Sequence, residues 1–527
     1  MVSLGNIYLL DCTLRDGGYV NDWRFGQEAI KGFAQKIVQT GIELFEVGFI
    51  KGDSYDPDRA VFPDTASIEP IIQPKSENVL YLGMLDMSAP VPKERIQPRH
   101  DNSIDGIRVI FKKEKIEEAY EYCEYIKNLG YLVFVNFVGT DLYSDKEFLD
   151  GLEKFNKLQP HAVSIVDSFG VIKRKHFLRL VYLADNNLDS KIILAYHAHN
   201  NLQQAFGNAE ALVEMNLKRD VIIDACVFGM GRGAGNLNLE LFAEYMNENY
   251  DTHYKIEPML EIMDEYLNDI YKTKFWGYSL PLYLSATTGC HPNYAIYLAE
   301  KDSLTVKSFN ELLKNIPQGD KAKFSKEKAE QYYRAYQENF FDDKAVLAEL
   351  SQQFNDKEIL ILAPGKSIVT NREQIKKISE SANTITIAVN FMGENYKPDY
   401  IFSSNMRRYG RIAGKTNAKC IITSNMKDAD VYDYMVNFSS YASKNADIID
   451  NSGLMLLRLL ASLGVKQVMI AGMDGYSQQY NENYFDLQLE YDFSNEFENR
   501  NMLIAEEMKA IQKQMKLSFI TPSNYIM

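Results

Sequence analysis

The sequence predicts an α/β protein in two parts: an N-terminal (β/α)8 barrel of the TIM type with a helical annex, and a smaller, open, Rossmann-like α/β domain. Eight short β-branched runs alternate with helical segments up to residue 227, residues 241–356 have a helical pattern, and strand signals return at 358. The chain of 527 residues also exceeds the roughly 250–300 residues that one core ordinarily serves. We therefore expect at least two domains.

The barrel prediction rests on the spacing of its strands. The predicted strands are 7–11, 44–49, 79–84, 106–111, 131–137, 162–167, 192–197 and 221–227. The segments between them, such as 27–39, 114–128 and 203–216, carry apolar residues at helical spacing. Eight βα repeats within about 240 residues favour a closed barrel over a doubly wound sheet. We assign the barrel to 1–240.

The rest of the chain divides into a helical connector and a second sheet. Helices are predicted at 256–271 and 304–315 and within 325–354, so that 241–356 forms an annex and connector. Strand signals then occur at 358–363, 384–389, 400–403, 420–423 and 466–471, with a helix at 453–463. We expect residues 357–527 to form an open α/β domain that binds a nucleotide or a glycan.

Composition narrows the class of function. The chain is 46% apolar and 24% charged, and it has no run near the ~20 apolar residues of a membrane span. Its start lacks a basic signal-peptide region, and its five scattered cysteines suit reduced thiols, so we expect a cytoplasmic protein without a zinc–cysteine site. A net charge of −15 disfavours nucleic acid and anionic membranes as partners. A small-molecule substrate is expected, and a homo-oligomer is compatible with this composition.

Two histidines at the end of the seventh predicted strand form the first candidate site. His197 and His199 are two residues apart and therefore point to the same side of the strand. With Asp16, which follows the first strand, they make a mixed nitrogen and oxygen set that suits Mn²⁺ or Mg²⁺, with Zn²⁺ as an alternative. A pair of surface histidines would give the same pattern, but only seven histidines occur in the chain and two are here, with Asn200 behind them.

Three motifs resemble, in order, those of the DRE-TIM metallolyase family. They are TLRDG at 13–17, HAHN at 197–200 and GMGRGAGN at 229–236, and Asp167–Ser168 resembles a fourth element. The resemblance covers about residues 5–300 and is greatest to the 4-hydroxy-2-oxovalerate aldolase branch. By itself, Arg15–Asp16 before two glycines would equally suit an ion-paired turn. The resemblance implies a metal-dependent lyase that works through the enolate of pyruvate or another 2-oxo acid, with an aldehyde partner.

The resemblance also implies roles for individual residues. It makes Asp16, His197 and His199 the metal ligands, with Asn236 either a further ligand or a loop-stabilising amide. Arg15 would donate to the enolate oxygen, the kind of electrostatic stabilisation that often supplies the largest catalytic effect. Ser168 would contact the substrate carboxylate, and Glu46 would either orient Arg15 or fill the barrel mouth.

The chain departs from the aldolase branch at the position of the general base. The branch typically has a histidine two residues after the glycine of the first motif, where this chain has Tyr19. A phenol with an ordinary pKa near ~10 is a poor base at neutral pH. The base is then elsewhere, with a metal-bound hydroxide, Tyr278 and His291 as alternatives, or Tyr19 acts as a donor. The aldehyde partner stays open.

Two glycine-containing loops partly match nucleotide-binding motifs, but neither has the complete motif. Residues 229–235 follow a strand but open no helix with a downstream acidic residue, so we expect this loop to close the barrel mouth. Gly365-Lys366-Ser367 lacks the upstream glycine of a phosphate-binding loop. What remains there is a strand followed by a glycine loop, which is common at nucleotide sites of open sheets.

Three segments of the second domain, 388–392, 398–409 and 451–476, resemble those of bacterial sialyltransferase-like and related surface-glycan domains, in which such loops hold a CMP-linked sugar. The loop residues expected to bind a ligand are Gly365, Ser367, Asn390, Ser404, Asn405, Ser452, Gly453 and Asp474. Arg407 and Arg408 either meet a phosphate or are solvated. The last histidine of the chain is His291, so the histidine base of those transferases is missing.

Four functions therefore compete. The leading hypothesis is the aldolase, and surface-polysaccharide biosynthesis would unite it with a sugar nucleotide in the second domain. A Claisen-type enzyme that uses an acyl-CoA is the alternative within the barrel. A CMP-sugar-dependent transferase, or a binding protein acting through the second domain, is the alternative outside it.

Overall fold

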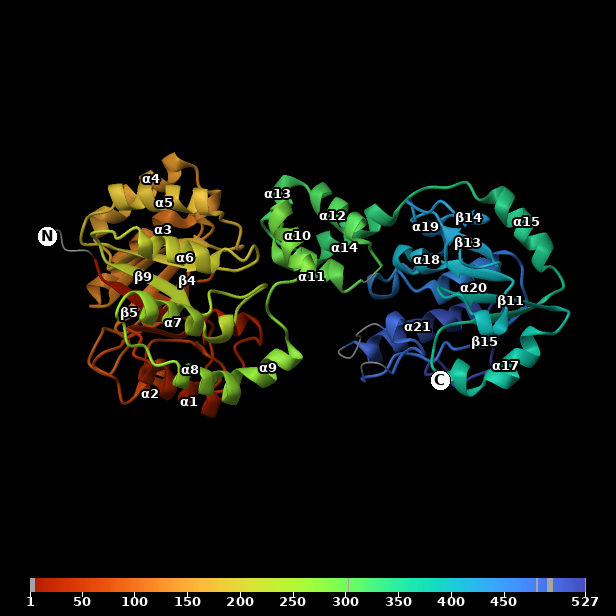
Figure 1. Ribbon diagram of the computed structural model, residues 1–527, viewed down its shortest axis with the longest axis horizontal. Helices are drawn as coiled ribbons and strands as arrows, with labels where there is room; N and C mark the ends of the chain where they lie inside the picture. The colour runs from red at the N-terminus through yellow and green to blue at the C-terminus, as the bar shows by residue number, and fades with distance from the viewer. Residues whose placement is uncertain (1–4, 302, 480–481, 491–495, 527) are drawn as a thin grey trace. The chain divides into compact units, whose positions relative to one another are not determined.

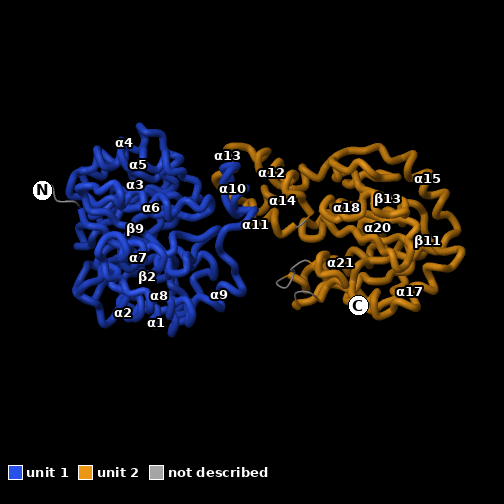
Figure 2. Tube along the Cα trace, viewed as in Figure 1, with its two compact units in different colours: residues 1–293 blue, residues 294–527 orange. Residues whose placement is uncertain are grey.

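A computed structural model describes residues 5–301, 303–479, 482–490 and 496–526 (Figure 1). It divides into two compact units, residues 1–293 and 294–527, which Figure 2 colours separately. The boundary falls inside the predicted annex, whose helices are shared between the units. None of the described helices combines the length and the hydropathy needed to cross a membrane.

The first unit is built on a closed, parallel, eight-stranded barrel. Its strands pair in the order β1-β9-β8-β7-β6-β5-β4-β2, β2 closes the barrel by pairing with β1, and β3 (Val61–Phe62) lies beside β2. The barrel strands are β1 Ile7–Asp11, β2 Leu44–Ile50, β4 Leu80–Asp86, β5 Gly106–Phe111, β6 Leu132–Phe137, β7 Ala162–Asp167, β8 Ile193–Ala198 and β9 Val221–Ala225. The predicted barrel is confirmed, and the predicted strands coincide with these to within two residues at either end.

Helices surround the barrel because their apolar faces pack on the outward side chains of the strands (Figure 1). They are α1 Gln27–Ile37, α2 Glu69–Ile72, α3 Ile116–Asn128, α4 Asp145–Leu158, α5 Arg174–Asn187, α6 Ala205–Glu214, α7 Leu239–Asn249 and α8 Glu257–Ile262. The predicted helix 256–271 is interrupted by a π-helical turn at Met263–Leu267, between α8 and α9 (Asn268–Thr273). The last helix of this unit is α10 (Leu280–Thr288), and α11 (Pro292–Ala299) spans the boundary.

Strand alternation fixes which side chains face the barrel interior. A small buried cluster that includes Leu44, Ala195 and Ile222 fills the inside of the barrel. Since every second residue of a strand points the same way, Glu46, His197 and Asp224 face inward one layer above it. The chemistry-bearing residues therefore form the next interior layer toward the carboxyl ends of the strands.

The second unit holds a parallel seven-stranded sheet among its described residues, in the order β14-β13-β12-β11-β10-β15-β16. Its strands are β10 Glu358–Leu362, β11 Thr384–Val389, β12 Tyr400–Ser403, β13 Lys419–Thr423, β14 Tyr434–Val436, β15 Gln467–Ala471 and β16 Lys516–Phe519. Strands β11 to β14 are added in sequence on one side of β10, and β15 and β16 are then added on the other side of β10. This confirms the predicted open α/β sheet, and it adds β14 and β16, which the sequence analysis did not identify.

The helices of the second unit fall into a group before the sheet and a group around it. The first group is α12 Val306–Asn315, α13 Gln318–Lys321, α14 Lys326–Gln337 and α15 Lys344–Phe354. The second is α16 Ser367–Thr370, α17 Arg372–Ser379, α18 Met406–Ile412, α19 Phe438–Tyr441, α20 Ser452–Ser462 and α21 Phe497–Gln512. The predicted helical stretch 325–354 is two helices, because residues 338–343 between α14 and α15 are not helical.

Candidate metal centre and second pocket

Asp16 is brought over the barrel by a tight turn after β1. The amides of Arg15 and Asp16 both donate to the Cys12 carbonyl, at 3.2 and 2.7 Å. The Thr13 hydroxyl accepts a hydrogen bond from the Val227 amide at 2.8 Å, which ties this turn to the loop after β9. The first motif thus has a defined structural basis: its backbone hydrogen bonds aim the Asp16 carboxylate into the barrel mouth.

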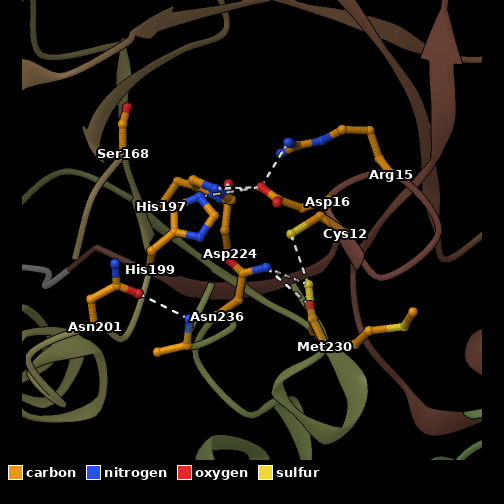
Figure 3. Close-up of polar contacts among 12 residues, drawn as sticks. Cys12, Arg15, Asp16, Ser168, His197, His199, Asn201, Asp224, Met230 and Asn236 are labelled. Atoms are coloured by element: carbon orange, nitrogen blue, oxygen red, sulfur yellow. Dashed lines mark hydrogen bonds and ion pairs between the residues drawn. The ribbon is translucent and has the colours of Figure 1, made fainter. Parts of the chain in front are cut away.

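His197 and His199 converge on that carboxylate. Asp16 Oδ2 lies 2.8 Å from His197 Nε2 and 3.8 Å from His199 Nε2, and all three side chains are buried. The two imidazole centres are 5.4 Å apart with nearly perpendicular planes. One ligand atom from each residue lies within 4.8 Å of the others. Figure 3 shows Asp16 between Arg15 and the two histidines.

The protonation states of this cluster suit metal binding. Burial lowers the pKa of His199 to about 4, so its ring is neutral near pH 7 and keeps a lone pair. Burial opposes ionisation of Asp16, but Arg15 and the histidines outweigh it and hold the pKa of Asp16 well below its ordinary value. Burial also disfavours the His197 cation, yet the hydrogen bonds to Asp16 and Asp224 raise the pKa of His197. A metal ion would therefore displace a proton from His197.

Two buried oxygens test whether a metal fits here. Within the described residues, Asp16 Oδ1 and Asn236 Oδ1 are buried and have no hydrogen-bond partner. Buried polar atoms are rarely left unsatisfied without a functional reason. Asn236 forms a backbone bridge with His199, and its amide nitrogen donates to Met230 O at 3.1 Å, which leaves its oxygen available. A carboxylate, two imidazoles and an amide oxygen suit a divalent cation with open positions.

A second group of potential ligands is less suitable. Cys12, His197 and Asp224 also lie within ligand distance of one another. Burial, however, raises the pKa of the Cys12 thiol well above its ordinary value, so the thiolate that binds metals is not formed near pH 7. Asp224 is also already paired with Arg108.

A buried ion network beneath the cluster orients its members, and two residues of this network, Arg108 and Asp224, were not predicted from the sequence. Asp224 Oδ2 lies 3.0 Å from His197 Nδ1 and pairs with Arg108, whose Nη1 lies 3.3 Å from Glu46 Oε2. Arg15 is held from two sides, with Nε 2.7 Å from Glu46 and Nη1 2.8 Å from Asp16. Glu46 therefore orients Arg15, one of the two roles expected for it. The sequence signal that could have identified Arg108 and Asp224 is a charged residue at an inward-facing position of an otherwise apolar strand.

The glycine-rich loop after β9 positions Asn236. Gly235 has φ +82°, and a Cβ there would lie 2.1 Å from the Gly229 carbonyl oxygen. The backbone N–H of Asn236 donates to the same carbonyl at 3.0 Å. Glycine at position 235 therefore allows the loop to fold back and present Asn236 beside His199.

Comparison with known proteins gives a family match for part of the barrel. Residues 106–265 match the sequence model of the family described as HMGL-like. This part of the barrel is similar to an HMGL-like domain. The chain is 23% identical over 244 residues to the 4-hydroxy-2-oxovalerate aldolase of Geobacillus genomosp. 3, covering 46% of this chain and 70% of the relative. It is 25% identical over 237 residues to that of Spirochaeta aurantia, covering 44% and 68%.

Solved structures similar to the chain include the N-terminal domain of an aldolase candidate from Bacteroides vulgatus. That match has 24% identity and a TM-score of 0.47, and it covers 55% of this chain and 96% of that one. The HMG-CoA lyase of Brucella melitensis matches at 16% identity and a TM-score of 0.40, covering 49% and 96%. The predicted DRE-TIM resemblance of the barrel is thus confirmed by its HMGL-like match and its aldolase relatives.

The remaining predicted residues of the first site lie in different surroundings. Tyr19 is 40% exposed at the mouth, where burial of its hydroxyl and the Asp16 carboxylate raise its pKa to about 12. Tyr278 lies between α9 and α10, is 54% exposed, and contacts the Tyr283 ring. The Ser168 hydroxyl accepts a hydrogen bond from the Gly139 amide at 2.9 Å and points away from the histidines in Figure 3. His291 contacts Arg232.

The second unit contains a pocket at the carboxyl edge of its sheet, of about 1000 Å³ including its open mouth. It is lined by residues that follow β10, β11, β12 and β15 and by the N-terminal end of α20. Five of the binding residues predicted from the sequence line this pocket: Asn390, Asn405, Ser452, Gly453 and Asp474. The position matches the topological switch point, where open α/β sheets bind ligands.

The other predicted residues of the second unit brace this pocket. Ser367 N donates to Asp474 Oδ2 at 2.8 Å, Gly365 N donates to Gly472 O at 2.9 Å, and Ser404 Oγ lies 2.6 Å from Ser452 Oγ. Arg407 is exposed, but the solvated interpretation is wrong for Arg408. Helix α18 turns that side chain inward, where it lines the pocket and donates to Leu489 O at 2.6 Å. The pocket is also lined by Lys301, Asp450 and Arg500, which were not predicted from the sequence because they lie outside its motifs.

Proposed function

We propose that the barrel is a divalent-metal-dependent carbon–carbon lyase of the aldolase type, acting through the enolate of pyruvate or another 2-oxo acid with an aldehyde partner. The observation that supports this most directly is the buried convergence of Asp16, His197 and His199 beside Arg15, at the carboxyl ends of the barrel strands. In (β/α)8 barrels this end carries the catalytic residues. The 4-hydroxy-2-oxovalerate aldolases among its relatives support the reaction class.

Asp16, His197 and His199 would hold the metal, Mn²⁺ or Mg²⁺, with Asn236 as a further donor. The cation would supply Lewis-acid polarisation of the keto group of the substrate. Asp224 and Arg108 act as positioning residues, since the Asp224 hydrogen bond to His197 Nδ1 fixes the ring so that Nε2 faces Asp16. Partners of this kind commonly change metal affinity by about 10- to 100-fold when they are removed.

Arg15 stabilises the enolate oxygen in this proposal. Its Nε and Nη1 are held by Glu46 and Asp16, which fixes the guanidinium plane and leaves the donors of Nη2 for the substrate. Burial disfavours the guanidinium cation, but Glu46 and Asp16 outweigh it and raise the pKa of Arg15, so the charge is permanent. A fixed charge in a buried site stabilises developing negative charge without reorganisation.

Tyr19 is assigned the role of hydrogen-bond donor. A phenol with a pKa of about 12 holds its proton near pH 7, so it is a poor general base. The same proton can be donated to the carbonyl oxygen of the aldehyde as the carbon–carbon bond forms. Ser168 keeps its expected role at the substrate carboxylate as a proposal, although its hydroxyl already accepts the Gly139 amide.

The test is exchange of the pyruvate methyl protons with D₂O, followed by ¹H NMR on the full chain with and without Mg²⁺. Asp16→Asn should reduce metal-dependent exchange by on the order of 10²-fold or more. Asp105→Asn, a change to a buried carboxylate at the opposite end of β5, is the matched control and should retain exchange. Full exchange in Asp16→Asn would refute the metal site. Exchange that requires an acyl-CoA would favour the Claisen alternative.

We propose a second site in the pocket of the C-terminal unit, for a nucleotide or a CMP-linked sugar. Support comes from its place at the switch point and from its polar lining, which includes Asn390, Ser452 and Asp474. Such a ligand would link the chain to surface-polysaccharide biosynthesis. Calorimetric titration of the full chain with CMP should give saturable binding that Ser452→Ala weakens. Absence of saturable binding would reject this site, and turnover of a CMP-sugar would favour the transferase.

A further inference from the structure

Aromatic and cationic side chains form a continuous patch at the barrel mouth, beside the metal cluster. This mouth patch consists of the exposed Tyr19 and Lys51 and the half-buried Arg232, packed on the buried rings of Trp23 and Phe49. The Tyr19 and Trp23 rings are 4.8 Å apart and the Trp23 and Phe49 rings 5.5 Å apart. Lys51 Nζ lies 5.8 Å from the Trp23 ring centre, and the Arg232 guanidinium carbon lies 5.9 Å from the Tyr19 ring centre.

Strand order explains why residues so far apart in sequence meet. Strand β1 pairs with both β9 and β2. Asp16 and Tyr19 follow β1, Lys51 comes directly after β2, and Arg232 lies in the loop after β9. Three neighbouring strands therefore place two cations on either side of the Asp16 loop, at the end of the barrel that carries the metal cluster.

Neither cation forms an ion pair with a carboxylate in the part of the chain that the structure describes. Within the described residues, no Asp or Glu oxygen lies within 4.0 Å of Lys51 Nζ or of the Arg232 guanidinium, whereas the deeper Arg15 has two such partners. Arg232 is half-buried and contacts the His291 ring. Burial and the neighbouring cations Arg232 and Lys112 lower the pKa of His291 to about 3, so this ring adds no negative charge.

Arg232 is not a freely solvated cation, because its side chain is half-buried and lies over the Tyr19 ring. A guanidinium that is held on an aromatic ring and lacks an acidic partner is well suited to a carboxylate or phosphate of a ligand. Its half-buried position strengthens such a contact relative to one in water.

We propose that the mouth patch, with Arg232 as its main contact, binds a carboxylate or phosphate group of the aldehyde partner, so that this partner is an anionic aldehyde. This inference rests on the proposed aldolase function and specifies its substrate class. Arg232 is then a specificity-determining residue, and the Tyr19 ring serves as the platform that orients it. The Tyr19 hydroxyl, on the same ring, is placed to meet the carbonyl end of that partner.

The experiment compares charged and neutral aldehydes on the full chain with Mg²⁺ and pyruvate. D-glyceraldehyde 3-phosphate is compared with D-glyceraldehyde, and glyoxylate with acetaldehyde, so that phosphate and carboxylate are separate arms. The wild type should prefer at least one anionic aldehyde by about 10-fold or more in kcat/KM, which is the scale of a hydrogen-bonded charge pair. Arg232→Gln should reduce that preference by about 10- to 100-fold, and Lys51→Gln by a smaller factor.

Arg99→Gln is the matched control, because Arg99 pairs with Asp105 at the opposite end of the barrel. The inference is overturned if the wild type prefers neither anion, or if Arg232→Gln and Arg99→Gln give the same ratio. Using a ratio within each variant removes differences in folding or metal loading.

Pyruvate exchange in D₂O separates this inference from the proposed function. Exchange without a charge preference would refute the anionic partner and leave the aldolase intact. If no exchange occurs, the aldolase proposal fails, and equilibrium binding of D-glyceraldehyde 3-phosphate against D-glyceraldehyde decides the inference. Saturable binding that is about 10-fold weaker in Arg232→Gln supports the anion site, and equal binding of both aldehydes overturns it.

Discussion

At the scale of single residues, two arginines at the barrel mouth differ in their ion pairing. Arg15 is buried and paired twice, so its charge is fixed in place beside Asp16. Arg232 has no carboxylate partner among the described residues and stands at the mouth. A paired, immobile cation suits stabilisation of charge that develops during the reaction, and an unpaired cation suits recognition of charge that the ligand already carries.

Arg15→Met is expected to reduce metal-dependent pyruvate exchange by about 10²- to 10³-fold, the usual effect of removing one donor to a developing oxyanion. Arg15→Lys should restore only part of this loss, since an ammonium group cannot bridge Glu46 and Asp16 as the planar guanidinium does. Single-turnover exchange followed by NMR measures both variants. An Arg15→Met enzyme with wild-type exchange would show that Arg15 is only a structural partner of Glu46.

At the scale of elements, the two ends of each barrel strand have different roles. The carboxyl ends carry the candidate metal ligands and their loops, and the interior below them is filled by apolar side chains such as Leu44 and Ile222. The glycine-rich loop after β9 lies at the carboxyl end, and its backbone folds around Asn236. Substitutions in the loop and in a helix of the barrel should therefore have different consequences.

Gly235→Ala should lower the free energy of unfolding and weaken metal binding, because the Cβ would meet the Gly229 carbonyl and φ is +82°. Gly207→Ala is the matched control: Gly207 lies in α6, and a Cβ there meets no other atom within 4 Å. Alanine in a helix should raise the free energy of unfolding by about 0.5–1 kcal/mol. Urea denaturation measures both. Equal effects of the two substitutions would argue against a strained loop.

His161, at the start of β7, should give the barrel a measurable acid sensitivity. Burial against the Phe134 ring lowers the pKa of His161 below its ordinary 6.5. The unfolded chain therefore binds this proton at a higher pH than the folded chain does. The stability contribution of the neutral ring is fully present above about pH 6.5 and is lost as the pH falls through the lower, folded-state pKa.

His161→Gln, which cannot be protonated, should lose less unfolding free energy than the wild type between pH 7 and pH 5. Urea titrations at each pH provide the comparison. His100→Gln is a suitable control, because His100 is exposed and pairs with Glu69 at the surface. The same pH dependence in His161→Gln and the wild type would show that His161 is not the responsible group.

At the scale of the whole molecule, the chain contains two units, each with its own sheet and its own apolar core. The candidate metal centre lies within the first unit and the switch-point pocket within the second. A ligand that binds only one folded unit should stabilise that unit alone.

Calorimetry of the full chain should accordingly show two transitions. Mg²⁺ at about 100 times its Kd should stabilise one of them by about 2.7 kcal/mol and leave the other unchanged. Asp16→Asn should abolish this shift, and Asp105→Asn should not. A single transition, or a shift of both transitions by the metal, would show that the two units unfold as one cooperative body.

The sequence by itself determined the architecture and brought together three residues of the candidate metal centre. Strand periodicity and length predicted both sheets, and the spacing of the TLRDG, HAHN and glycine-rich motifs predicted that Asp16, His197 and His199 meet, because strand ends of a closed parallel barrel converge. The polar loops of the second domain were predicted because loops that follow the parallel strands of an open sheet commonly form ligand sites.

Only the tertiary structure decided what surrounds those residues. Arg108 and Asp224 lie on strands that read as apolar, and their pairing with Glu46 and His197 depends on strand order around the barrel, which sequence spacing does not encode. The pKa of Tyr19 and the position of Arg232 over the Tyr19 ring likewise depend on burial and on neighbours from other strands. Local sequence specifies elements and their ends, whereas electrostatics depends on distances across the fold.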